Sequence, residues 1–236
     1  VTPAVLITLG GLILITILDK RKVRGSILWG IIVSAAIAWV YAYFNKDTAA
    51  SLGITVPQGI IKFESINKIA GKMDFSYMLN LNNMKSFVTV IFTFLFVDFF
   101  DTVGTLVGVC SKANMLDEKG EVPNVGKALM SDAIATSAGA ALGVSTVTTY
   151  VESATGVSAG GRTGYTAITT GALFLVAMFF SPIFVAIPSC ATAPALIYVG
   201  YLMLSTVKDI EFNNITEGVP AFLTIASMPL TYSIGD

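Results

Sequence analysis

Residues 96–105 read Phe-Val-Asp-Phe-Phe-Asp-Thr-Val-Gly-Thr and stand inside an apolar run that extends from Ser86 to Val109. A run of this length matches the roughly 20 residues that a helix needs to cross a bilayer core. Four side chains of the stretch share one helical face, because they are spaced i, i+3, i+4 and i+7: Asp98, Asp101, Thr102 and Thr105. A carboxylate near mid-bilayer costs at least about 2.5–3.5 kcal/mol on insertion scales. The stretch therefore predicts a membrane-spanning helix whose polar face points into the protein.

The composition places the whole chain in the same class. Of 236 residues, 54% are hydrophobic and 12% are charged, whereas soluble domains carry about 25% charged residues. We therefore expect an all-α polytopic membrane protein, multi-pass in the plasma or inner cell membrane. The net charge of −1 and the scattered basic residues give no face for a nucleic acid. The sequence has no histidine, so proton chemistry falls to Asp, Glu, Tyr or Lys.

Other apolar runs predict further spans or partial spans. They cover residues 3–18, 26–44, 128–144, 163–180, 183–205 and 219–234. Residues 45–85 are more polar and rich in turn formers, so they predict an extramembrane loop with an amphipathic surface helix. Apolar runs lie at both ends, next to Val1 and Asp236, and we expect this chain to be a piece of a longer protein.

A second polar site is expected around Glu152. Residues 145–150 are β-branched and predict extended backbone, and a short segment with Gly156 follows Glu152. A half-helix beginning there would direct free N–H groups and its positive dipole end at a ligand. Transporters build binding sites from such broken helices. The alternative is that Glu152 merely caps its own helix.

Three further candidates have simpler interpretations. Asp98 could be a structural partner rather than a ligand, and Asp132 favours a structural hydrogen bond over gating. Arg162 follows a Gly-Gly pair and most simply anchors a tight turn, with gating as the alternative. No phosphate loop, metal-ligand spacing or activated nucleophile occurs, so an enzyme is not expected. The motifs of an intramembrane aspartyl protease are absent too.

Three strings carry a resemblance to a known family. They are Phe-Phe-Asp-Thr-Val-Gly-Thr-Leu at 99–106, Thr-Thr-Tyr-Val-Glu-Ser-Ala-Thr-Gly-Val at 148–157 and Gly-Gly-Arg-Thr-Gly at 160–164. With Met-Pro-Leu-Thr-Tyr-Ser-Ile at 228–234, they closely resemble the AzgA-like purine permeases of the nucleobase/ascorbate transporter superfamily. The resemblance covers most of the chain from Ser86 onward.

The resemblance implies a UraA-like fold of fourteen spans in two inverted seven-span repeats, with a core and a gate domain. Residues 1–44 would be the last two spans of the first repeat, 45–85 a loop, and 86–236 the truncated second repeat. A short β-strand at residues 146–150 would precede the half-helix. The missing spans of the same protein would complete the pocket, and a homodimer is a further expectation.

The implied function is proton-coupled uptake of adenine, guanine or hypoxanthine, with the proton as coupling ion and no cofactor or metal. Substrate contacts would come from Asp101, Glu152, Tyr150, Val151 and Thr105. Proton coupling would involve Asp101, Glu152 and Asp98, while Asp132, Arg162 and Gly156 would be structural or gating residues. Related uracil permeases have a histidine at the position of Thr105, so its absence favours the purine branch. The alternatives are another solute on the same fold, such as uracil, xanthine or an anion, or a non-transporting receptor.

Overall fold

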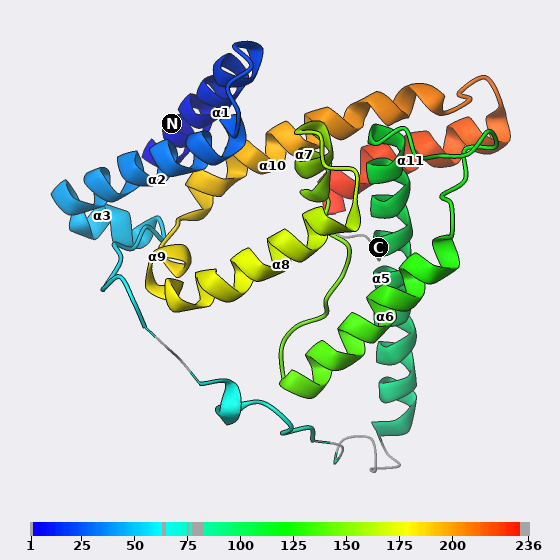
Figure 1. The fold of residues 1–236 in the computed structure, drawn as a ribbon, viewed down its shortest axis with the longest axis horizontal. Coiled ribbons are helices and arrows are strands. Elements are labelled where there is room, and N and C mark those ends of the chain that lie inside the picture. Colours follow the sequence, from blue (N-terminus) through cyan, green and yellow to red (C-terminus); the bar gives the residue numbers. More distant parts are fainter. Residues whose placement is uncertain (1, 63–64, 75, 77–82, 232–236) are drawn as a thin grey trace. The chain divides into compact units, whose positions relative to one another are not determined.

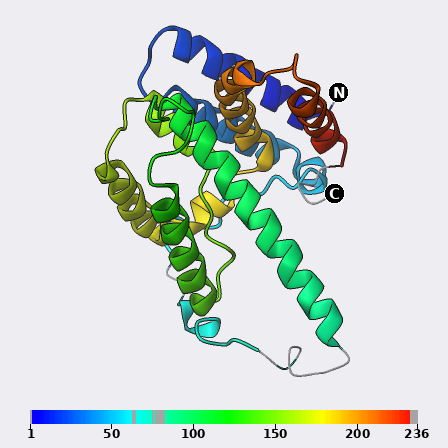
Figure 2. The same cartoon turned by 90° about the vertical axis from the view of Figure 1, so that its right-hand side faces the viewer.

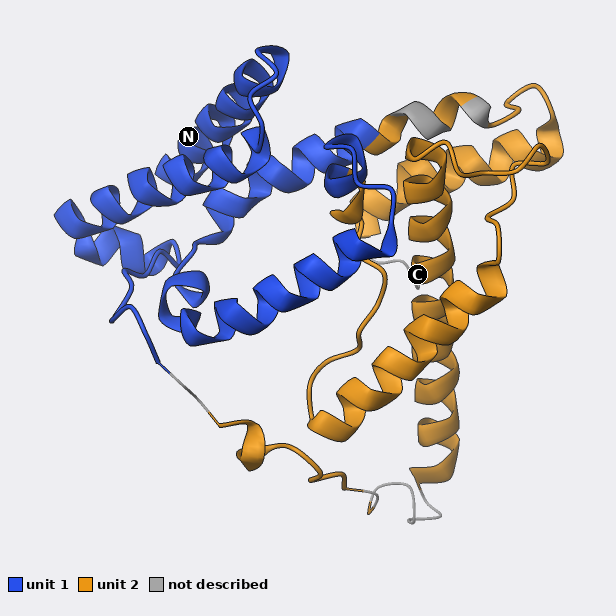
Figure 3. Ribbon diagram, in the orientation of Figure 1, with its two compact units in different colours: residues 1–64, 155–202 blue, residues 65–154, 203–236 orange. Residues whose placement is uncertain are grey.

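The computed structural model describes residues 2–62, 65–74, 76 and 83–231. The chain forms two compact units, residues 1–64 with 155–202 and residues 65–154 with 203–236 (Figure 3). Each unit therefore joins segments that are far apart in the sequence. The regular structure of the described residues is helical (Figure 1).

The first unit contains α1 (Pro3–Lys20), α2 (Ser26–Phe44), α3 (Lys46–Ser51), α8 (Gly164–Phe179), α9 (Ser181–Val185) and nearly all of α10 (Ser189–Met203). The second contains η1 (Ile66–Lys68), α5 (Met84–Lys112), α6 (Val125–Leu142), η3 (Leu204–Asp209) and α11 (Ile215–Thr231). The short α7 (Ser153–Ser158) contains the boundary between the units. Three helices, α1, α2 and α5, are long and apolar enough to cross a membrane, and α8 and α10 are shorter apolar helices.

Small side chains let α1 and α2 pack closely in the first unit. The buried positions of α2 include a stripe at every fourth residue: Ser26, Gly30, Ser34, Ala38 and Ala42. Ile15 of α1 is fully buried, and a Cβ on Gly30 would overlap its side chain. Small residues of this kind matter in a bilayer, because burial from water does not drive helix association there.

Helix α10 packs onto the same pair. Ala195 and Tyr198 of α10 form a buried cluster with Ile15 of α1. Two hydrogen bonds connect α1 and α2 to residues at and just before the start of α10. Thr8 Oγ1 donates to Cys190 O at 3.1 Å, and Trp39 Nε1 donates to Ala186 O at 3.0 Å. The carbonyls just before and within the first turn of α10 thus have side-chain partners.

The second unit is built on α5, which Figure 2 shows as one unbroken helix. At 1.5 Å per residue its length is about 43 Å, more than the bilayer core requires. Its buried residues, Thr102, Thr105 and Gly108, lie at intervals of three along one face. Helix α6 ends at Gly143, whose φ of 74° is the left-handed conformation that favours glycine at a helix C-terminus.

Several expected elements differ in detail from those observed. Residues 183–205 are not one span, because α9 ends at Val185 and α10 begins after Pro188, which has no N–H to continue a helix. The last helix begins at Ile215 rather than near 219, because Asn214 Oδ1 accepts from Thr216 N at 3.2 Å and caps it.

The expected loop and strand also differ from the elements observed. In the loop 45–85 the structure has the short α3 and η1, and residues 63–64, 75 and 77–82 lie outside the described residues. In this loop the hydrogen bonds from Ser76 lower the pKa of Asp74. Residues 144–150 are neither helix nor strand, so the expected β-strand stays a prediction.

Two adjacent glycines of α1 provide a test of this packing. A Cβ on Gly11 would collide with Ser34 Oγ and lie 2.8 Å from Pro194 Cγ, whereas a Cβ on Gly10 would meet nothing within 4 Å. We expect Gly11→Ala to lower the unfolding free energy by about 1–3 kcal/mol through overpacking. Thermal unfolding in detergent measures this, with Gly10→Ala as the matched control. Equal midpoints for the two variants would contradict the packing of α1, α2 and α10.

Candidate functional site

The polar face of α5 points inward, as its spacing predicts. Thr102 and Thr105 are 1% and 6% exposed, and they are two of the four buried polar side chains of the described chain. Asp98 and Asp101 are half-buried beside them. The face therefore presents two hydroxyls and two carboxylates on a helix that is otherwise apolar.

A network of threonine hydroxyls joins this face to α6 and to residues 145–150. Thr102 Oγ1 donates to Asp132 Oδ2 at 3.1 Å and lies 2.9 Å from Thr148 Oγ1. Thr149 Oγ1 donates to the other oxygen of the Asp132 carboxylate at 3.3 Å. Asp132 thus receives two hydroxyl hydrogen bonds, one from α5 and one from the Thr-rich segment.

Two more contacts hold the Thr-rich segment, which we define as residues 145–150. Thr146 Oγ1 donates to Asp98 Oδ1 at 3.1 Å, and Thr136 Oγ1 of α6 donates to Val147 O at 2.7 Å. The segment has no ladder or helix to fix its backbone, so side chains from α5 and α6 supply the contacts that place it. The carboxylates of Asp98 and Asp132 thus both accept hydrogen bonds from threonine hydroxyls.

Asp101 differs from these two acids. No described residue donates a hydrogen bond to its carboxylate or forms an ion pair with it. Asp101 lies on the same face as Thr102 and Thr105, about midway along α5.

The residues around Glu152 form a turn into α7. Ser153 N donates to Tyr150 O at 3.1 Å, and Ala154 N donates to Val151 O at 3.0 Å. Tyr150, Val151 and Glu152 are exposed, with the Tyr150 side chain 56% accessible. Glu152 directly precedes α7, which is six residues long. The contacts of the described residues include none between Asp101 and Glu152.

The end of α7 is closed by the predicted Gly-Gly-Arg turn. Arg162 Nη1 donates to Gly161 O at 2.8 Å and also to Val157 O, and Gly161 N donates to Gly156 O at 2.9 Å. Gly160 has a φ of 103°, which a residue with a side chain rarely adopts. The guanidinium thereby satisfies carbonyls at the C-terminal end of this short helix.

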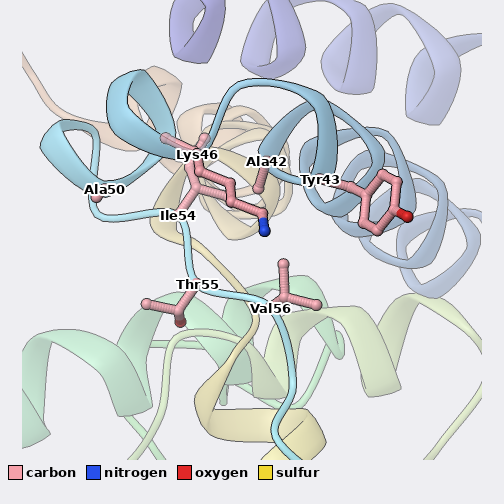
Figure 4. A pocket seen from close by; sticks show the side chains of 8 residues that line it. Ala42, Tyr43, Lys46, Ala50, Ile54, Thr55 and Val56 are labelled. Carbon is pink, nitrogen blue, oxygen red and sulfur yellow. The ribbon is translucent and has the colours of Figure 1, made fainter.

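Two surface pockets are lined by none of the candidate site residues named above. The pocket in Figure 4 has a volume of 320 Å³ and is lined by Ala42, Tyr43, Lys46, Ala49, Ala50, Ile54, Thr55 and Val56. The second, of 440 Å³, lies along α6 beside Met130 and Ile134. In the described part of the chain no group of three His, Cys, Asp or Glu side chains could hold a metal ion.

Sequence reasoning did not identify the threonines that hold the site together. The run at 146–149 predicts extended backbone, but its hydroxyls also donate to Asp98 and Asp132 and contact the Thr102 hydroxyl. The available signal was the coincidence of a hydroxyl-rich stretch with acids in nearby apolar helices. In such surroundings a carboxylate needs hydrogen-bond donors, and threonines can supply them.

The sequence matches the Permease family over residues 1–235. It is 45% identical to a permease of Methanocaldococcus jannaschii over 98% of this chain and 50% of that protein. Adenine permease AdeQ of Escherichia coli is 40% identical over 98% of this chain and 49% of its own length. Guanine/hypoxanthine permease PbuG of Bacillus subtilis is 41% identical over 98% and 50%.

Apolar helices of spanning length define a multi-pass membrane protein. The match over nearly the whole chain makes the assignment specific: this chain belongs to the Permease family. The chain spans about half the length of the curated relatives it matches.

Thr136 provides a test of how the Thr-rich segment is held. Thr136→Val keeps the shape of the side chain but leaves the Val147 carbonyl without the donor that now lies 2.7 Å away. We expect the unfolding free energy to fall by about 1 kcal/mol, measured by thermal unfolding in detergent. Thr89→Val is the control, because that exposed hydroxyl bonds only to Lys85 O of its own helix among the described residues. A midpoint for Thr136→Val equal to that of Thr89→Val would rule out this contact.

Proposed function

We propose that the whole protein takes up purine nucleobases, namely adenine, guanine or hypoxanthine, together with protons. The names of the relatives AdeQ and PbuG support this substrate class, because 98% of this chain aligns with each of them. A purine offers ring and exocyclic N–H donors, and a carboxylate is a strong acceptor for them.

The observation that carries the proposal is the difference between Asp101 and its neighbours. Threonine hydroxyls satisfy Asp98 and Asp132, while no described residue pairs with the Asp101 carboxylate. An ionisable group inside a membrane span is costly, and it marks a substrate or proton pathway by default. Asp101 is therefore the acid of α5 that we assign to the purine N–H groups, with Asp98 as a structural partner.

Glu152, Tyr150 and Val151 complete the proposed contacts. The three are consecutive, exposed and placed directly before α7. The Tyr150 ring could stack on or border the purine, and Glu152 could accept a second N–H. Thr105, buried on the same face of α5 as Asp101, would line the part of the site that α5 forms.

Proton coupling would involve the same carboxylates. Coupling follows if the proton occupancy of Asp101 or Glu152 changes when substrate binds. Uptake together with a proton requires that the substrate-bound protein hold that proton more tightly than the empty protein does. No cofactor or metal is needed for this step. The proton acts as the coupling ion.

The proposed architecture extends beyond this chain. We infer a fold of fourteen spans in two inverted repeats, in which residues 1–44, 45–85 and 86–236 have the places given by the family resemblance. A short strand at 146–150, additional spans that complete the pocket, and a homodimer belong to the same proposal. The relatives are about twice as long as the part that this chain matches, which leaves room for these spans.

Uptake of radiolabelled purine tests the function directly. In cells that lack their own purine permeases, the whole protein should take up labelled adenine, guanine or hypoxanthine, and excess uracil or xanthine should compete weakly. Stronger inhibition by uracil or xanthine than by these purines would move the protein to another substrate class.

Substitution of the two acids tests their roles. We expect Asp101→Asn and Glu152→Gln each to reduce uptake at least about tenfold and to flatten its dependence on pH, because a neutral amide cannot carry a proton. Glu118→Gln is the control, since Glu118 is exposed in the loop between α5 and α6. Uptake that keeps its rate and its pH dependence in both variants would exclude these acids from the site.

A further inference from the structure

The contacts of Asp132 give each hydrogen bond of the network a direction. A threonine hydroxyl carries one proton, and Thr102 gives its proton to Asp132 Oδ2. In the pair Thr102–Thr148, at 2.9 Å, Thr148 must then be the donor. Thr149 donates to Asp132 Oδ1 at 3.3 Å. Hydrogen bonds therefore run from the Thr-rich segment toward one carboxylate, directly through Thr149 and indirectly through Thr148 and Thr102.

Both oxygens of the Asp132 carboxylate accept in this pattern. Hydrogen bonds to a carboxylate are stronger than those between neutral groups. Thr102, the link between Asp132 and Thr148, is 1% exposed, so water cannot easily replace a lost protein contact. The network is thus a set of directed contacts that end on one carboxylate.

The network also fixes the approach of the chain to the proposed substrate contacts. Thr148 and Thr149 directly precede Tyr150 and Glu152, and all of these residues belong to the second unit. Residues 144–150 belong to no helix or strand, so their placement depends on the side-chain hydrogen bonds that they make with α5 and α6. A change at Asp132 or Thr102 should therefore displace Tyr150 and Glu152, although Asp132 need not touch a ligand.

We propose that Asp132 is a positioning residue that sets substrate affinity by holding the Thr-rich segment through Thr102, Thr148 and Thr149. The inference rests on the proposed function for the identity of the substrate. It goes further in assigning Asp132 an effect on the binding geometry of Tyr150 and Glu152, rather than only a place in the helix packing.

The test compares substitutions of Thr102 in the whole protein. Thr102→Val removes the hydroxyl, and we expect the KM for purine uptake to rise about tenfold while the maximal rate stays within about twofold. Thr102→Ser keeps the hydroxyl and should restore a KM near that of the unaltered protein. Thr93→Val is the matched control on the same helix, because the exposed Thr93 hydroxyl bonds to Thr89 O at 2.9 Å.

A double-mutant cycle shows whether the two residues act through one path. Asp132→Asn offers one acceptor oxygen instead of two, so its KM should rise at least as much as that of Thr102→Val. If both act by releasing the same segment, the double variant should have a KM close to the larger single value. Increases in KM that multiply would show independent effects and would overturn the proposed path.

A substrate-independent measurement separates this inference from the proposed function. In a background in which Cys110, Cys190 and any cysteine of the whole protein outside this chain are replaced by serine, a cysteine introduced as Tyr150→Cys can be labelled with a maleimide. We expect Thr102→Val and Asp132→Asn to change its labelling rate at least threefold, and Thr93→Val to leave it unchanged. Unchanged labelling in both variants would overturn the inference even if purines are transported.

The uptake and labelling results together distinguish the possible failures. If the labelling rate changes but no purine is taken up, the positioning effect stands and the substrate assignment fails. If the labelling rate changes but KM does not, the segment is released without an effect on substrate affinity, and the inference is wrong. KM and labelling rate do not depend on the amount of protein, so poor expression of one variant leaves both measurements valid.

Discussion

A charged side chain inside an apolar protein is costly unless it has hydrogen-bond partners, and in the second unit threonine hydroxyls supply them to Asp98 and Asp132. Helices α5 and α6 carry acids within their apolar stretches, and their neighbours supply hydroxyl donors rather than basic groups. Thr146 serves Asp98, while Thr102 and Thr149 serve Asp132. The same contacts fix the Thr-rich segment, which has no regular hydrogen bonding of its own. The same hydrogen bonds therefore give these acids their partners and hold the Thr-rich segment in place.

Threonine suits this role for a physical reason. Its hydroxyl neutralises no charge, so the carboxylate keeps its charge and its acceptor strength, whereas a lysine or arginine would cancel much of the local field. Threonine is also β-branched and favours extended backbone, which agrees with the irregular course of residues 144–150. Asp101 receives no such hydrogen bond from the residues that the structure describes.

The first unit meets a different constraint, the close approach of apolar helices. The stripe on α2 from Ser26 to Ala42 has nothing larger than alanine or serine at its five positions. Because lipid and side chain are equally apolar, contact between helices depends on shape, and a single added methyl group at Gly11 or Gly30 has nowhere to go. Because burial from water does not drive helices together in lipid, the first unit relies on the close packing of small residues, and the second relies on hydrogen bonds from hydroxyls.

The sequence by itself determined the class of protein, the approximate positions of most of the longer helices and the polar face of α5. These follow from hydrophobic length, from Pro and Gly breaks and from the helical repeat, all of which are local properties. Ser26–Phe44 has the same ends in the sequence and in the structure, and Thr102 and Thr105 are buried as their spacing indicates. The inference that Asp98 and Asp101 share a face needed no tertiary information.

The tertiary structure alone decided which side chains donate to each acid. The sequence analysis gave Asp98 and Asp132 possible structural roles and favoured Asp101 for the substrate, but it named no donor for any of them. Their difference depends on Thr146, Thr148 and Thr149, which approach across 17 to 48 positions of the chain. The start of α11 at Ile215 likewise depended on the side chain of Asn214, which outweighed the apolar pattern that begins later. Hydrogen bonds between distant segments leave no periodic trace in a sequence, because one donor at the right place is sufficient.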